Sequence, residues 1–198
     1  MRKIDLDSLP HLVNCFYRII NRHWFTFWSR LLSAWWGVSL GRECSFFGLP
    51  CFRRHPRSHI TIASDCEFLS SQTANLIGIN RPCIISTLAE GAEIKIGSHC
   101  GFSGTVIGCA TSIIIGNNVR CGANTLITDT DWHSDDPRSG ADSPVTIKEN
   151  VWLGVNVTVL KGVTIGENTL VGAGSLVTRS LPANVFAAGS PAKVIRQI

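Results

Sequence analysis

Residues 127–136, ITDTDWHSDD, place four aspartates and one histidine within ten positions. An imidazole, with an ordinary pKa of about 6.5, is unprotonated at neutral pH yet basic enough to take a proton from a hydroxyl. The aspartates could orient the ring, hold a substrate, bind calcium or be merely solvated. Calcium is disfavoured because the glycine-centred spacing of the usual calcium loop is missing. His133 is therefore a candidate base, and Asp131 and Asp129 are candidates to orient it or the substrate.

A period of six organises most of the chain. Every sixth residue is aliphatic in a run that comprises Ile147, Leu153, Val159, Ile165, Val171 and Val177. An α-helix cannot keep this period on one face, but short strands joined by tight turns can, if each six residues form one side of a prism. Three sides make one coil, so Ile147 and Ile165 should stack in successive coils. The pattern predicts a parallel β-helix with a dry aliphatic core.

The period also shows where the chain leaves the prism. The same phase recurs from Ile115 to Ile127, but it breaks between His133 and Pro144. The interrupting stretch SDDPRSGADSP is rich in turn formers and acids, so a projecting loop is predicted at about residues 133–144. His133 then stands at the lip where the coil ends and the loop begins, which is a natural place for a site.

The motifs NVWLG, VGAGSLVT and AAGSPAKVI, together with DTDWH, resemble those of the hexapeptide-repeat acyltransferases. This family includes maltose and galactoside O-acetyltransferases and the O-acetyltransferases of bacterial surface polysaccharides. The likeness covers roughly residues 60–198. It implies an all-β fold, a left-handed parallel β-helix, a homotrimer, and acetyl-CoA bound as co-substrate in a groove between subunits. The left hand follows from the resemblance alone, because the general rule for parallel crossovers favours the right hand.

The resemblance also implies roles for individual residues. His133 matches the family's catalytic base, and the backbone N–H of Val155 matches the donor to the oxyanion formed on the thioester carbonyl. The residues implied to bind the cofactor are Trp152, Gly154, Ala173, Thr178, Arg179, Lys193 and Arg196. The basic residues suit the phosphates of coenzyme A. Alternatively, they form a solvated face, and Trp152 packs on the outside of the prism or at a subunit contact.

The expected acceptor is a saccharide hydroxyl, in a surface polysaccharide or a lipid-linked glycan. The small-sugar enzymes have an asparagine and an aspartate where this chain has Phe102 and Cys109. Polysaccharide-modifying relatives instead share the Ser-Gly pair at Ser103 and an inserted segment like Gly78–Leu88. Ser103 is therefore a candidate substrate contact beside Asp129. Two alternatives stay open: N-acetylation of a nucleotide-linked amino sugar, and a catalytically silent β-helix scaffold.

Residues 1–42 are predicted to form an amphipathic helical segment ahead of a β-helix domain at residues 43–198. Residues 11–36 carry four of the six tryptophans, interleaved arginines and no acid. The apolar run is too interrupted to span a bilayer, for which about 20 apolar residues are needed. A basic, tryptophan-rich helix suits peripheral contact with the inner face of the plasma membrane. The alternative is a helix that packs on the β-helix or across a trimer.

Composition narrows the remaining classes. With 198 residues, 44% hydrophobic content and a net charge of +4, the chain fits one ordered domain. Its eight cysteines contain no CxxC pair, so no metal is expected, and they are predicted to be reduced core residues of a cytoplasmic protein. Nucleic acid is disfavoured because the basic stretch FRRHPRSH lacks a recognised binding fold.

Overall fold

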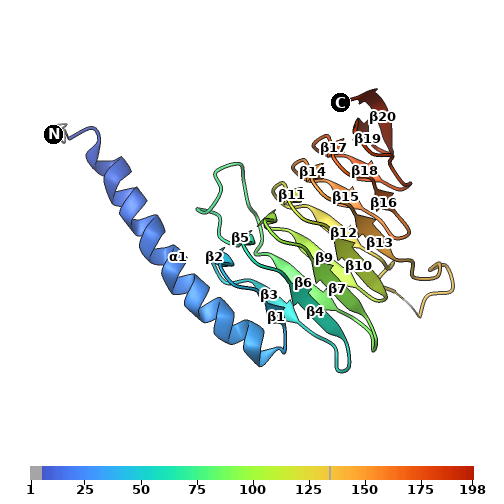
Figure 1. The fold of residues 1–198 in the computed structure, drawn as a ribbon, viewed down its shortest axis with the longest axis horizontal. Helices are drawn as coiled ribbons and strands as arrows, with labels where there is room; N and C mark the ends of the chain where they lie inside the picture. Colours follow the sequence, from blue (N-terminus) through green and yellow to red (C-terminus); the bar gives the residue numbers. More distant parts are fainter. Residues whose placement is uncertain (1–5, 134) are drawn as a thin grey trace.

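The computed structural model describes residues 6–133 and 135–198. Within them, the long helix α1 (Leu9–Trp35) is followed by twenty short strands. From β1 to β18, successive strands join three different sheets in turn, so three strands make one coil. Figure 1 shows the coils stacked side by side from α1 toward the C-terminus. The parallel β-helix predicted from the six-residue period is confirmed.

Each side of the prism is one sheet of parallel strands. The first sheet contains β1 (Ser39–Leu40), β4 (His59–Ile62), β7 (Glu93–Ile96), β10 (Ser112–Ile115), β13 (Val145–Ile147) and β16 (Thr164–Ile165). The second contains β2 (Ser45–Phe47), β5 (Glu67–Leu69), β8 (Gly101–Ser103), β11 (Arg120–Cys121), β14 (Trp152–Leu153), β17 (Leu170–Val171), β19 (Val185–Gly189) and β20 (Ala192–Gln197). The third contains β3 (Cys51–Arg53), β6 (Ile84–Thr87), β9 (Val106–Cys109), β12 (Leu126–Thr128), β15 (Thr158–Val159) and β18 (Leu176–Val177). In the second sheet, β20 alone is antiparallel to its neighbour, β19.

The core is a column of stacked apolar side chains. Ile147 pairs with Ile165 as expected, and every member of the aliphatic run from Ile147 to Val177 is 0% exposed. Toward the N-terminus phenylalanines take over, and the rings of Phe46, Phe68 and Phe102 stack at centroid distances of 4.9 and 5.0 Å. Complete burial of one such side chain contributes about 1.5–3 kcal/mol, so the stacked column is the main source of stability.

The corners of the prism use left-handed backbone. Asn150, Asn168 and Asn184 stack at one corner with φ between 56° and 58°, a conformation that asparagine adopts more readily than most residues. Their side chains form a ladder, in which Asn150 Nδ2 donates to Asn168 Oδ1 at 3.0 Å and Asn168 Nδ2 donates to Asn184 Oδ1 at 2.8 Å. The ladder joins the same corner of successive coils and holds these corners in register.

Both ends of the stack are covered. α1 lies across the N-terminal end and the β19–β20 hairpin closes the C-terminal end (Figure 1). Phe25, Leu32 and Trp36 pack against the core from the helix end. The hydroxyl of Thr26 accepts a hydrogen bond from the Phe46 N–H at 2.9 Å, which satisfies a donor on the edge of the first coil. In the described part of the chain, no helix is long and apolar enough to cross a membrane.

Two long connections leave the stack. One joins β5 to β6 through residues 70–83, and the other joins β12 to β13 through residues 129–144. Both are visible as loops in Figure 1. The segment Gly78–Leu88 was expected as an insertion. Only its first part leaves the stack, because Ile84–Thr87 is the regular strand β6, paired to β3 and β9.

Candidate active site

A groove of about 920 Å³ crosses the outer face of the second sheet, from β5 to β17. Since its lining comes from strands of successive coils, the groove extends along the stack. Five of the predicted site residues line it, namely Ser103, Trp152, Gly154, Val155 and Ala173. The structure thus gathers part of the expected site on one surface.

The side of this groove is built on glycines that let neighbouring coils approach closely. A Cβ on Gly154 would lie 2.6 Å from the nitrogen of Ala173, and one on Gly122 would lie 2.7 Å from the nitrogen of Val155. Among residues 6–133 and 135–198, no hydrogen-bond acceptor is found for the Val155 N–H. A half-buried donor of this kind can stabilise a negatively charged oxygen.

The end of the groove nearer α1 is more polar. The Ser103 hydroxyl is buried and accepts a hydrogen bond from Asn75 Nδ2 at 3.3 Å. Asn75 belongs to the loop of residues 70–83, which Asn124 holds in place by donating to the Gly78 carbonyl at 2.8 Å and accepting from Asn80 N at 3.0 Å. Sequence analysis did not predict that the loop of residues 70–83 forms one wall of the groove, since nothing in a polar loop indicates that the loop turns back over a groove.

Other charged and aromatic side chains line the same surface. Trp152 is 54% exposed, and its strand pairs in register with Arg120 of the preceding coil. His99 is exposed at a corner and also borders the groove. A cation such as Arg120 beside an exposed indole forms a surface that suits a substrate with both charged and apolar parts.

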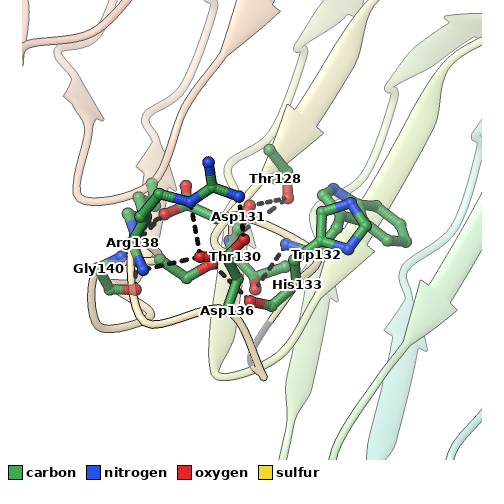
Figure 2. A network of polar contacts seen from close by, with 10 residues as sticks. Thr128, Thr130, Asp131, Trp132, His133, Asp136, Arg138 and Gly140 are labelled. Carbon is green, nitrogen blue, oxygen red and sulfur yellow. Dashed lines mark hydrogen bonds and ion pairs between the residues drawn. The ribbon is translucent and has the colours of Figure 1, made fainter.

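His133 lies at a different corner, after β12 of the third sheet. Its carbonyl accepts hydrogen bonds from the Asp136 N–H at 3.1 Å and from the Ser139 hydroxyl at 2.5 Å. These bonds fix the main chain and leave the imidazole exposed. In Figure 2 the rings of Trp132 and His133 point away from the Asp136–Arg138 side of the loop.

Trp132 positions this corner by packing on Gly108 of the preceding coil. A Cβ at Gly108 would lie only 2.3 and 2.6 Å from two carbons of the indole ring. Trp132 itself has φ 68°, an unusual value for a bulky residue. The sequence signalled neither Gly108 nor Trp132 as positioning residues, because they come together only through the register of β9 and β12.

Asp131 is held by the loop rather than by His133. Its carboxylate accepts hydrogen bonds from Lys161 Nζ at 2.6 Å and from the Gly140 N–H at 3.1 Å. The hydrogen bond from Lys161 keeps the pKa of Asp131 below its ordinary value. Lys161 Nζ also donates to the Gly140 carbonyl at 2.8 Å, so this lysine closes the base of the loop.

Asp129 is 0% exposed and its carboxylate is saturated by its own chain. It accepts hydrogen bonds from the backbone N–H groups of Ala110, Thr111 and Ser112 at 2.6–2.8 Å. The Thr111 hydroxyl donates at 2.8 Å and the Cys109 thiol at 3.3 Å. This residue therefore caps a turn of the preceding coil, a structural role in place of the substrate contact expected from sequence.

The remaining predicted cofactor residues fall into two groups. Thr178 and Arg179 follow β18 and lie at the same corner as His133, farther along the stack. Lys193 and Arg196 lie on β20, which extends the sheet that carries the groove. The Arg196 guanidinium lies 5.7 Å from the Phe186 ring centroid. The cations of β20 are thus placed beyond the C-terminal end of the groove, where they could meet phosphates.

One chain does not bring the two halves of the site together. Val155 and Ala173 lie where the second sheet passes into the third, whereas His133 lies where the third sheet passes into the first. His133 does not line the groove. Transfer of an acyl group needs the base and the oxyanion donor on the same reacting atoms, and within one chain the residues expected in these two roles lie at different corners.

Comparison with known proteins identifies the family. A model of the bacterial transferase hexapeptide, six repeats, matches residues 144–179. The "putative lipopolysaccharide biosynthesis O-acetyl transferase WbbJ" of Escherichia coli K12 is 32% identical over 169 residues, which cover 79% of this chain and 80% of that protein. The chain therefore belongs to the hexapeptide-repeat acetyltransferase family, and the resemblance drawn from its motifs is confirmed.

Other relatives match a shorter stretch. The galactoside O-acetyltransferase of Escherichia coli K12 is 40% identical over 114 residues, which cover 54% of this chain and 56% of that protein. The chain thus spans about half the length of this relative. A solved structure of a mutant of AntD, an N-acyltransferase from Bacillus cereus in complex with dTDP-4-amino-4,6-dideoxyglucose and coenzyme A, gives a TM-score of 0.64 at 20% identity. It covers 85% of this chain and 88% of AntD, and it confirms the left-handed β-helix.

Proposed function

We propose that this protein is an O-acetyltransferase that moves an acetyl group from acetyl-CoA to a saccharide hydroxyl. The observation that carries the proposal is the 32% identity with WbbJ over about four fifths of both chains. That relative's name, which gives lipopolysaccharide biosynthesis, also favours an acceptor in a surface polysaccharide or a lipid-linked glycan. The protein is proposed to act in the cytoplasm. The chain is proposed to work as a homotrimer, with peripheral membrane contact through residues 11–36.

The groove, together with the cations beyond its end, suits coenzyme A. Its side offers the N–H of Val155, the exposed ring of Trp152 lies beside it, and Lys193 and Arg196 lie beyond its far end. Acetyl-CoA supplies the activated acyl carbon. The proposed contacts place its thioester beside Val155 and its phosphates toward β20, with Thr178 and Arg179 contributed by the corner of a neighbouring copy.

His133 of the neighbouring copy acts as the general base. Its imidazole takes the proton of the saccharide hydroxyl while the hydroxyl oxygen forms a bond to the acyl carbon. The carbonyl oxygen gains negative charge, which the Val155 N–H stabilises. As the carbon–sulfur bond breaks, the proton passes from the imidazolium to the leaving thiolate, so the protein ends unchanged. Asp131 is proposed to orient this corner through Lys161 and the loop backbone.

The acceptor is expected at the end of the groove nearer α1. Ser103 and Asn75 there present a hydroxyl and an amide that can recognise sugar hydroxyls. Such buried polar groups discriminate strongly against a substrate that leaves them unpaired. Asp129 is not included, because its carboxylate is already saturated.

The test is release of free thiol from acetyl-CoA by the purified full chain, with a panel of oligosaccharides, simple sugars and nucleotide-linked amino sugars. Release that depends on a hydroxyl acceptor, and that falls by about 10²–10⁴ in His133→Ala, supports the proposal. His59→Ala, which alters an exposed histidine of the first sheet, is the matched control and should leave turnover unchanged.

Two other results would contradict this proposal and favour a different function. Product formed only with a nucleotide-linked amino sugar would establish N-acetylation, one form of the N-acyl transfer stated for AntD, whose fold is similar. Binding neither acetyl-CoA nor a saccharide would favour a silent scaffold.

A further inference from the structure

The outer face of α1 is apolar along its whole length. Twelve large apolar side chains of this helix are between 43% and 85% exposed. Six of them follow one another at spacings of three or four residues, which places them in one stripe. They are Phe16, Ile20, Trp24, Phe27, Leu31 and Trp35. Such a continuous stripe on a helix surface marks an interaction site.

The opposite face of α1 is fixed against the protein. Arg22 forms an ion pair with Glu67 of β5, and Thr26 accepts a hydrogen bond from the Phe46 N–H. Ser29 and Ser33 are buried beneath the helix. These contacts set the rotation of α1 about its axis, so the apolar stripe cannot turn inward onto the β-helix.

Positive charge is concentrated around this helix. Residues 8–57 contain seven arginines and one acidic residue, whereas residues 58–198 contain nine basic and eleven acidic residues. Arg42 and Arg53 are exposed just beyond the helix, and the guanidinium of Arg53 lies 4.7 Å from the Trp36 ring centroid. An apolar stripe with tryptophans and a basic surround complements an anionic lipid surface.

We propose that the outer stripe of α1 lies in the interface of an anionic phospholipid membrane, with the helix axis parallel to the bilayer. This specifies the membrane contact of the proposed function by its face, its lipid charge and its orientation. A second copy of the chain fits this face less well, because each such end carries an excess of arginines over acids and two of them would repel one another.

The orientation has a consequence for the groove. Since α1 lies across one end of the stack (Figure 1), the coils project away from the bilayer. A smaller pocket of about 350 Å³, lined by Arg18, Arg22 and Phe47, shares Glu67 and Leu69 with the groove. The end of the groove proposed to hold the acceptor therefore opens beside the membrane-facing helix. The placement of the acceptor rests on the proposed transferase activity, whereas the membrane contact does not.

The test is co-sedimentation of the full chain with vesicles, which needs no turnover. Wild type should bind vesicles of phosphatidylglycerol and phosphatidylcholine at least about tenfold more tightly than vesicles of phosphatidylcholine alone. The double variant Trp24→Gln/Phe27→Gln should bind the anionic vesicles at least about tenfold more weakly, because it removes apolar surface without changing charge. Ile198→Gln, the same kind of change at an exposed site at the other end of the stack, should bind like wild type.

Absence of wild-type binding to anionic vesicles, or equal binding of the double variant, would overturn the proposal. Light scattering of both proteins without lipid completes the test. A lower subunit number in the double variant would assign the stripe to contact between copies and would also overturn it. His133→Ala should bind vesicles like wild type, so failure of the proposed chemistry and failure of the membrane contact remain distinguishable.

Discussion

Replacing Gly108 by alanine should disable the candidate base while leaving the fold intact. The added Cβ would lie 2.3 and 2.6 Å from two indole carbons of Trp132, whereas carbon atoms in ordinary contact are about 3.5–4.0 Å apart. The ring must therefore retreat by roughly 1 Å or more. Because Trp132 is 47% exposed, it can move outward into solvent. Gly108 does not have a positive φ, so its backbone conformation is open to alanine.

The movement is transmitted to His133 because it is the next residue. A displacement of about 1 Å from productive geometry can cost about 100-fold in rate. We expect kcat/KM for acceptor-dependent thiol release to fall by about that factor in Gly108→Ala, with the melting temperature changed by only a few degrees. The assay is thiol release at varied acceptor concentration, beside thermal unfolding followed by circular dichroism.

A double-mutant cycle isolates the cause. Trp132→Ala should itself lower kcat/KM, and adding Gly108→Ala to it should cost little more, because the clashing ring is already gone. Full activity in Gly108→Ala, or losses that simply multiply in the double variant, would refute the reasoning.

Two further predictions concern the acids near His133. Asp129→Asn should lower the free energy of unfolding by about 2–4 kcal/mol, measured in urea, because its amide group would face backbone donors that now bind a carboxylate; a loss below about 0.5 kcal/mol would contradict the capping role. Lys161→Met should raise the pKa of Asp131 toward its ordinary value, as read by NMR titration of its carboxyl carbon. Since the folded-state pKa is depressed, the Asp131–Lys161 contact should stabilise the loop at neutral pH and be lost as the pH falls through that pKa. An unchanged Asp131 pKa in the variant would argue against the contact.

The repeat could be predicted from sequence because each hexad residue reports its own burial. Ile147 and Ile165 need no knowledge of distant residues to be assigned to stacked strands. The separate roles of the aspartates of ITDTDWHSDD were harder to predict, since these residues look alike in the sequence. In the structure Asp129 caps a turn, Asp131 binds Lys161, and Asp136 binds Arg138. Their partners are brought in by the register between coils and by the path of the loop, which composition does not encode.

The candidate site, likewise, could be predicted from the sequence only in part. Motifs predicted the groove residues Trp152, Val155 and Ala173, which the structure places together. They did not show that His133 lies at another corner of the chain, because a motif does not say which corner faces a groove. Likewise, the amphipathic pattern of α1 was evident in the sequence, but its inward side is fixed by Glu67 and Phe46, which lie beyond the helix.

The two covered ends of the stack also determine how long this structure can be. A β-helix grows by adding strands to an exposed edge, and nothing in its repeat limits the number of coils. Without α1, the edges of the first coil would present unpaired donors such as the Phe46 N–H to any passing strand. The same applies to the last coil without the antiparallel turn of β20. Helix and hairpin thus act as terminators, and loss of either should convert a discrete enzyme into a template for end-to-end fibres.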